Sequence, residues 1–132
     1  PEELVARQCD IWDPYLDWAA DSLGARLHPR IGMIHESQDP AALRILSEHV
    51  HALNEFELAA FHDLVSLSGS LVLGFAAVRG VHPAPVIWAA SRVDETWQEQ
   101  QWGQDEEAQR VADIKKTAFA HAKSFWDSVQ TI

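Results

Sequence analysis

The sequence lacks several features that would place it in a familiar class. It contains one cysteine, Cys9, so no internal disulfide can form, and this fits a reducing compartment. The uncharged run at 64–78 has 15 residues, fewer than the roughly 20 needed to span a bilayer. We therefore expect a globular domain without membrane insertion, in which this run forms a buried helix.

Positive charge is also scarce. Hydrophobic residues make up 47% of the chain, which is enough for a folded core. Lysine and arginine number 10 against 20 aspartates and glutamates, so the formal net charge is −10. A chain of this charge repels the phosphates of nucleic acids and anionic membrane surfaces. The composition therefore argues against nucleic acid as a partner.

No catalytic or metal-binding motif is complete. Glu48 and His51 form a single Glu-x-x-His, whereas a di-iron bundle needs two of these and further carboxylates. The segment 68–70, Ser-Gly-Ser, lacks the Gly-x-Ser-x-Gly turn of a serine nucleophile. His62 and Asp63 are adjacent, and adjacent helical side chains point about 100° apart, so we expect them not to face each other. The sequence predicts no enzyme, no cofactor, no metal and no small-molecule substrate. A bundle that binds a metal or small molecule through its histidines and glutamates, and a structural dimerisation domain, stay open as alternatives.

Capping residues predict two helices in the first part of the chain. Asp13-Pro14 and Asp39-Pro40 each combine a capping carboxylate with a proline, which the first helical turn tolerates. We place the first helix at about 14–23, with helical residues before it as well, and end it at Gly24. Residues 25–38 are expected to form an extended connector. The apolar stripe of the second helix consists of Leu43, Leu46, Val50 and Leu53.

A capping box at 54–57 starts the third helix. After its first turns this helix is apolar on every side, as expected of a central element. Ser66, Ser70 and Gly74 recur at steps of four, and we expect this face to let a neighbouring backbone approach closely. Serine hydroxyls that bond back to carbonyls predict a bend or break near Gly69.

Two more helices complete the chain. One is expected over 84–102, followed by Gly103 as its stop and Asp105 as the cap of the next. The inward stripe of the first consists of Val86, Ala90, Val93 and Trp97. The stripe of the second consists of Val111, Ile114, Ala118, Ala122, Phe125 and Val129. We therefore predict an all-α fold, a compact bundle of five or six helices around an apolar central helix, in one domain over residues 1–132.

The segment 91–108, SRVDETWQEQQWGQDEEA, is the most informative part of the chain. Between Asp94 and Glu107 it has six carboxylates, two tryptophans and no lysine or arginine. Aromatic anchors inside a charged rim are typical of protein-binding surfaces rather than of catalytic pockets. On spacing alone a second interpretation stays open, in which a solvated acidic helix packs its tryptophans inward.

Four segments resemble one protein family in their order and spacing. They are WDPYLDWA from Trp12, LHPRIGM from Leu27, HDLVSLSGSLVLGFA from His62 and the acidic segment 91–108. Over nearly its whole length the chain resembles the assembly chaperones that bind the alpha subunit of the F-type ATP synthase catalytic head, in mitochondria and alphaproteobacteria. The Ser-Gly-Ser helix and the Trp-Gly-acidic element are the specific parts. The chain departs from the family at two positions, Thr96, where an acid is usual, and Glu99, where an apolar residue is usual.

The resemblance implies a non-enzymatic chaperone that holds the free alpha subunit until a beta subunit replaces it. The family signature falls here on Trp97, Gln98, Trp102, Gly103, Asp105 and Glu106. Glu95, which we place on the same face as Trp102, completes the expected partner-binding set. Glu106 is expected to contact the client, while Trp97 and Gly103 have an alternative role in holding the turn that presents it.

The resemblance also bears on location and domain organisation. It implies the cytoplasm of an alphaproteobacterium, or the mitochondrial matrix if the source is eukaryotic. The chain begins Pro-Glu-Glu. We therefore expect it to be a fragment whose true start has been removed. The resemblance implies that it is the carboxy-terminal part of a longer protein, whose strand-rich amino-terminal domain lies outside this sequence.

Overall fold

All regular structure in the described chain is helical. The structure is a computed structural model that describes residues 2–27 and 39–130. Its elements are α1 (Glu2–Trp18), the π-helix η1 (Ala19–Leu23), α2 (Pro40–His51), α3 (Glu55–Ser68), α4 (Leu71–Val78), α5 (Ala84–Ser91), α6 (Val93–Trp102) and α7 (Glu106–Gln130). No strand occurs within these two ranges, which confirms the predicted all-α class.

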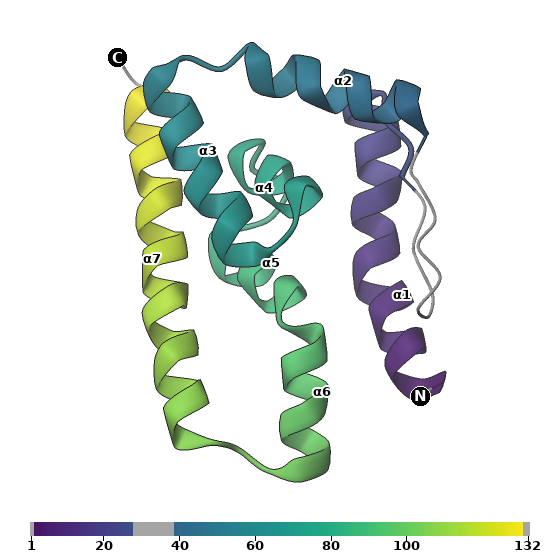
Figure 1. The fold of residues 1–132 in the computed structure, drawn as a ribbon, viewed down its shortest axis with the longest axis vertical. Coiled ribbons are helices and arrows are strands. Elements are labelled where there is room, and N and C mark those ends of the chain that lie inside the picture. The colour runs from purple at the N-terminus through teal and green to yellow at the C-terminus, as the bar shows by residue number, and fades with distance from the viewer. Residues whose placement is uncertain (1, 28–38, 131–132) are drawn as a thin grey trace.

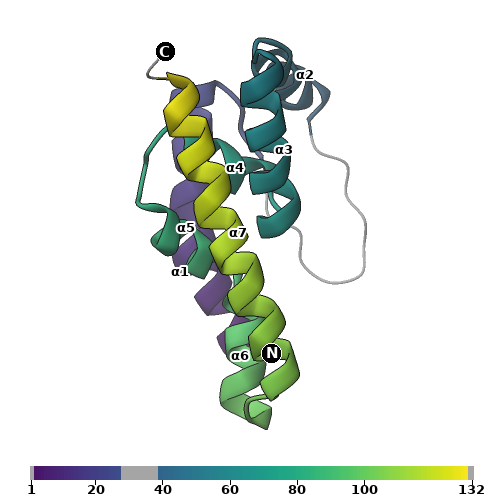
Figure 2. The ribbon, with the colours of Figure 1, turned by 90° about the vertical axis from the view of Figure 1, so that its left-hand side faces the viewer.

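The helices are arranged around α4 (Figure 1). α7 lies along α3 on one side, α1 lies on the other side, and α2 crosses between them at one end. α5 and α6 lead away from α4 toward the opposite end, where a turn joins α6 to α7 (Figures 1 and 2). The end of α7 returns to the start of α3, where the Gln130 side chain donates a hydrogen bond of 2.6 Å to Glu57.

The short helix α4 is the centre of the core. Its residues 72–77 are all buried. Phe75 packs with its ring centroid 4.6 Å from that of Phe61 on α3 and 5.9 Å from that of His49 on α2. Burial of apolar surface contributes about 25 cal/mol per Å² to folding, so this uninterrupted apolar helix is a main source of stability. The predicted apolar central helix is confirmed.

Three predicted helix starts are also confirmed. The side chains of Asp39 and Asp105 each accept a hydrogen bond of 3.0 Å from a backbone N–H in the first turns of α2 and α7. At the start of α3, Asn54 and Glu57 exchange side chain–backbone hydrogen bonds of 2.8 and 2.9 Å. Such caps satisfy amide groups that have no partner inside the helix.

The capping box makes the start of α3 sensitive to acid. The hydrogen bond from the Asn54 backbone, and then that from the Gln130 side chain, lower the pKa of Glu57. A carboxyl whose pKa is lowered by folding stabilises the fold above its unfolded pKa, and this contribution is lost as the pH falls through the folded pKa. We expect Glu57→Gln to lower the melting temperature slightly at neutral pH, and this difference to vanish at acid pH.

Thermal melts of wild type and Glu57→Gln across a series of acidic and neutral buffers measure this effect. Glu55→Gln is the matched control, because Glu55 occupies the same helical turn but lies outside the capping box. A melting difference for Glu57→Gln that stays constant with pH would contradict the assignment.

The predicted helix start at Asp13-Pro14 is wrong. Both residues lie inside α1, which already begins at Glu2. Proline lacks an N–H, so one hydrogen bond is lost where α1 passes through Pro14, but the helix continues. Gly24 ends the helical segment in a left-handed conformation with φ 76°, as expected. Residues 28–38 of the predicted connector lie outside the described residues.

The third predicted helix breaks at Gly69, and this overturns the predicted small-residue face. Gly69, with φ 72°, ends α3, and the Ser70 side chain caps α4 by accepting a backbone hydrogen bond of 3.1 Å. Ser66 is exposed on α3, so it shares no face with Ser70 and Gly74. Of the three, Gly74 makes the close approach, because a Cβ built there would lie 2.6 Å from Cγ2 of Val65. The break near Gly69 was predicted correctly.

The single helix predicted over 84–102 is in fact two helices. Arg92, with φ −106° and ψ 17°, separates α5 from α6. Ala90, Val93 and Trp97 are buried as expected, but Val86 is 49% exposed. Together with the break at Gly69, this separation gives seven α-helices in the described residues, in place of the five or six predicted.

Two further apolar stripes differ from the prediction. On α2, Leu46 is buried, whereas Leu43 is exposed. On α7, the ring of Phe119 lies 5.6 Å from that of Trp88 on α5, and the predicted residue Ile114 is 63% exposed. The residues that α7 buries are Ala112, Phe119, Ala122 and Trp126, and three of the predicted stripe, Val111, Ile114 and Phe125, are exposed. The predicted stripe is therefore correct at Ala122, which is buried, whereas the other residues that α7 buries lie outside that stripe.

Candidate partner-binding site

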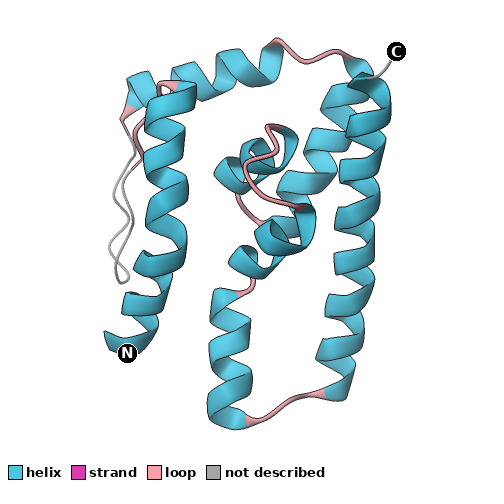
Figure 3. Ribbon diagram, turned by 180° about the vertical axis from the view of Figure 1, so that it is seen from behind, coloured by secondary structure: helices cyan, strands magenta, loops and turns pink. Residues whose placement is uncertain are grey.

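The turn between α6 and α7 lies at the end of the molecule farthest from α2, where Figure 3 shows it as the loop that joins the two helices. Gly103 takes φ 91°, a value that favours glycine, and its N–H donates a 2.9 Å hydrogen bond to the carbonyl of Glu99. Asp105 then caps α7, whose first residue is Glu106. We call the residues 102–106 the tip.

The two tryptophans of the acidic segment have different environments. Trp102 at the tip is 84% exposed, whereas Trp97 is 8% exposed. The Arg7 guanidinium of α1 lies 5.1 Å from the centre of the Trp97 ring, a cation–π contact. The inward-packing interpretation therefore holds for Trp97 alone, and Trp102 remains an exposed aromatic anchor.

The other predicted partner-binding residues are on the surface. Gln98, Gly103, Asp105 and Glu106 are all exposed. Glu95 is half-exposed and lies 3.8 Å from the guanidinium of Arg92. The structure thus presents Trp102 and three carboxylates of the set to solvent. Trp97, which also belongs to α6, has a buried side chain.

Helix α1 fixes the positions of α5 and α6 through polar contacts that the sequence did not reveal. The Arg7 guanidinium donates a hydrogen bond to Gln100. The side chain of Gln8 donates to Asp94 at 2.6 Å. One turn further along α1, the indole of Trp12 donates to the carbonyl of Ala90 at 2.7 Å. These partners are 78 to 93 residues apart in sequence, so no local pattern could have indicated them.

A cleft of about 470 Å³ opens beside this contact. Its walls come from α1, from the break between α3 and α4, and from Ser91 at the end of α5 with Asp94 and Glu95 at the start of α6. The serine hydroxyls in it already have partners, since Ser68 donates to the carbonyl of Leu64 at 2.7 Å and Ser91 to that of Trp88 at 2.6 Å. Each of these two hydroxyls donates its hydrogen to a backbone carbonyl of its own helix, so both have a structural role.

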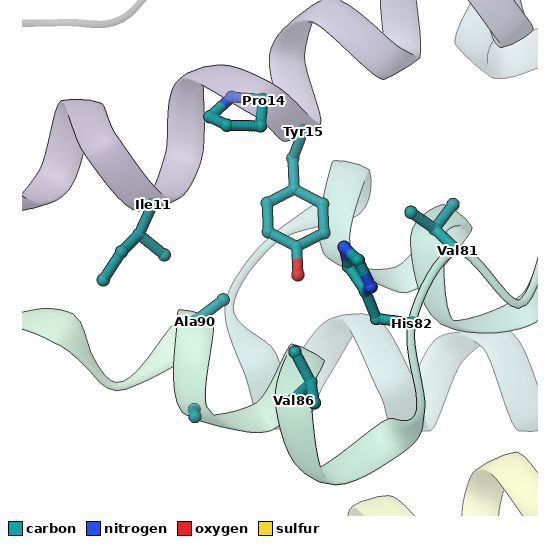
Figure 4. Close-up of a pocket in the computed structure, with 8 residues that line it drawn as sticks. Ile11, Pro14, Tyr15, Val81, His82, Val86 and Ala90 are labelled. Atoms are coloured by element: carbon teal, nitrogen blue, oxygen red, sulfur yellow. The ribbon is translucent and has the colours of Figure 1, made fainter.

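A smaller hollow of about 360 Å³ lies between α1 and α5 (Figure 4). Tyr15 projects from α1 toward His82, and the two rings meet edge to face with centroids 5.9 Å apart. Burial raises the pKa of the Tyr15 hydroxyl, so the phenol is neutral at physiological pH. The other described lining residues are apolar and include no carboxylate that could orient the imidazole as a base. This hollow is a packing feature.

The other histidines in the described part of the chain have structural or exposed positions. His49, from the incomplete metal motif, lies 3.0 Å from the carbonyl of Leu23 through its Nε2 atom. His62 lies 3.8 Å from the Asp63 carboxylate, so the expectation that they would not face each other is wrong, but both side chains are exposed. Within the described ranges no three potential ligands come together as a metal site. None of the described helices is long and apolar enough to cross a membrane.

Solved structures match this fold closely, although no protein-family model matches the chain. The crystal structure of Atp12 from Paracoccus denitrificans has a TM-score of 0.93 and 46% identity, over 96% of this chain and 55% of that one. An aspartate-to-lysine variant of the Paracoccus protein gives 0.93 and 45%, over 96% and 54% of the two chains. A protein of Agrobacterium tumefaciens described as a candidate chaperone gives 0.86 and 36%, over 98% and 48%.

The fold and the tip define an all-α domain that presents an exposed aromatic residue among carboxylates. The matched structures contain the same fold as part of longer chains, and this chain spans about half of their length. The chain belongs to the Atp12 family. This confirms the family that the four sequence segments indicated.

Proposed function

We propose that this chain is the helical part of a non-enzymatic chaperone for assembly of the F-type ATP synthase catalytic head, and that it binds the free alpha subunit before beta pairs with it. The observation that carries the proposal is Trp102, which is 84% exposed at a turn flanked by carboxylates. Membership of the Atp12 family supports the chaperone role, and the sequence resemblance supplies the alpha subunit as client. We further propose that this chain is the carboxy-terminal part of a longer protein whose amino-terminal domain is strand-rich. We propose that this protein acts in an alphaproteobacterial cytoplasm or a mitochondrial matrix.

The tip has the properties that transient holding of a subunit requires. An unassembled subunit exposes an apolar interface that would otherwise self-associate. A chaperone must cover that interface and still release it. One large aromatic side chain supplies contact area, while carboxylates around it speed encounter more than they prolong residence.

Glu106 is the residue of the tip that we expect to recognise the client. Its side chain is exposed in the first turn of α7, so Glu106→Lys loses only a favourable interaction with the helix dipole, worth about 0.3–1 kcal/mol of stability. If the carboxylate meets a cation on the alpha subunit, charge reversal also creates a like-charge contact. We expect the Kd for the alpha subunit to rise about tenfold or more.

Glu107→Lys is the matched control for this experiment. Glu107 occupies the same turn but already pairs with Arg110 at 2.6 Å, so reversal of its charge tests the general acidity of the turn. Binding to immobilised alpha subunit and thermal melting should be measured for both variants. Wild-type affinity in Glu106→Lys, or equal losses in the two variants, would contradict a specific role for Glu106.

A further inference from the structure

We infer that the cleft of about 470 Å³ between α1, the 68–73 segment and the start of α6 is a second client contact, and that it takes a segment carrying a basic side chain among apolar ones. The inference rests on the proposed function and extends it from the tip along α6. Glu95, already in the expected partner-binding set, lines this cleft, so the two surfaces are continuous along one helix.

The apolar part of the cleft suits large aliphatic or aromatic side chains. Its apolar lining includes Val5, Trp12, Leu16, Leu71 and Val72. A volume of about 470 Å³ falls within the range of roughly 300–1,000 Å³ that is usual for ligand pockets, so it has room for a few side chains of a peptide segment.

The negative charge of the cleft favours an occupant with a basic side chain. Asp13, Asp94 and Glu95 line it, and none of the described lining residues is a lysine, arginine or histidine. Asp94 accepts a hydrogen bond from the neutral amide of Gln8, which orients the carboxylate without cancelling its charge. Glu95 already lies 3.8 Å from the Arg92 guanidinium, so an occupant that buries Asp13 and Asp94 needs a cation of its own for those two, since uncompensated burial of charge is costly.

The Ser-Gly-Ser motif gives the cleft one of its walls. The three residues 68–70 end α3 and start α4, and all of them line the cleft. Gly69 has no side chain, and an added Cβ there would meet no atom within 4 Å. The Ser68 hydroxyl turns back to the carbonyl of Leu64. The Ser-Gly-Ser motif, one of the parts specific to the family, therefore leaves open space in the cleft at Gly69.

A second copy of this chain is the less favourable occupant. The net charge of −10 means that two copies repel each other, and the carboxylates in the cleft would face a partner of the same sign. A basic and apolar segment of a different protein complements both the charge and the lining.

Cys9 provides a direct probe, because it lines the cleft, is half-buried and is the one cysteine of the sequence. We expect saturating alpha subunit to slow alkylation of Cys9 by a maleimide at least about fivefold, since a seated segment blocks access to the thiol. Mass spectrometry of the intact chain follows the reaction. Protection that grows with the concentration of this chain alone would show that a second copy occupies the cleft, and would overturn the inference.

Asp94→Asn tests the charge without changing the shape of the cleft. The asparagine keeps an oxygen that can accept the Gln8 hydrogen bond, so we expect an unchanged melt and a Kd for the alpha subunit about tenfold higher. Asp63→Asn removes an exposed carboxylate of α3 that does not line the cleft, and it should bind as wild type does.

The outcomes separate the two proposals. If wild type does not bind the alpha subunit, the proposed function and this inference both fail. If wild type binds while Cys9 is alkylated at the same rate and Asp94→Asn keeps full affinity, the cleft is not a client contact and the proposed function stands.

Discussion

Replacement of Phe75 by alanine is expected to lower the free energy of unfolding by about 3–5 kcal/mol, the usual cost of truncating a buried aromatic residue. Phe75 is 2% exposed on α4, and its ring packs against those of Phe61 and His49. Neighbours on α2 and α3 can close the resulting cavity only in part, because their own helices are held by caps and by other contacts. Denaturant unfolding followed by far-UV circular dichroism measures the loss.

Phe56→Ala is the control, since it deletes the same ring from a site that is 62% exposed. Its effect should stay within about 0.5 kcal/mol. Equal midpoints for the two variants would show that α4 is not the centre of the core.

Gly74→Ala should destabilise the fold by about 1–3 kcal/mol through overpacking, although alanine favours a helix by about 1 kcal/mol over glycine. The added Cβ would lie 2.6 Å from Val65 Cγ2 and 3.3 Å from Phe61 Cε1. Valine has a stiff side chain in a helix, so it cannot rotate away to relieve the overlap.

A double-mutant cycle with Val65→Ala identifies the source of this loss. Once the valine methyl groups are absent, Gly74→Ala should cost less, with a coupling energy between the two sites of about 0.5–3 kcal/mol. An identical cost in both backgrounds would mean that α3 and α4 do not approach each other at this point.

Helix starts could be predicted where their chemistry is local. The caps at Asp39, Asn54 and Asp105 act within one turn, so a few residues of sequence suffice to recognise them. Asp13-Pro14 looks the same in sequence but lies inside α1, because the helix has already begun upstream. An Asp-Pro pair therefore marks a helix start only if the residues before it are not helical. Tertiary contacts decide whether those residues form a helix.

The sequence could not show which of two apolar faces of a helix is buried, or which of two tryptophans in one segment is buried. Trp97 and Trp102 belong to the same acidic segment, and the position of α1 decides that the first is covered by Arg7. On α7 the pattern favoured Ile114, whereas packing against α5 buries Phe119. Each choice depends on a helix far away in the sequence.

The same distinction applies to the candidate site. The tip is continuous in sequence, so its residues could be proposed from the pattern of tryptophan, glycine and carboxylates at 97–106. The cleft could not be foreseen, because it forms only where α1, the 68–73 segment and residues 91–95 come together.

The packing of α3 against α7 has a consequence for synthesis of the chain. Glu57 and Gln130 are hydrogen-bonded although 73 residues separate them. At about 5–20 residues per second, a ribosome needs roughly 4–15 s to make the sequence between them. During that interval α7 is incomplete, so the side of α3 that it later covers lacks this partner. A nascent copy of this domain therefore passes through the same exposed condition as the free subunit that we propose it protects.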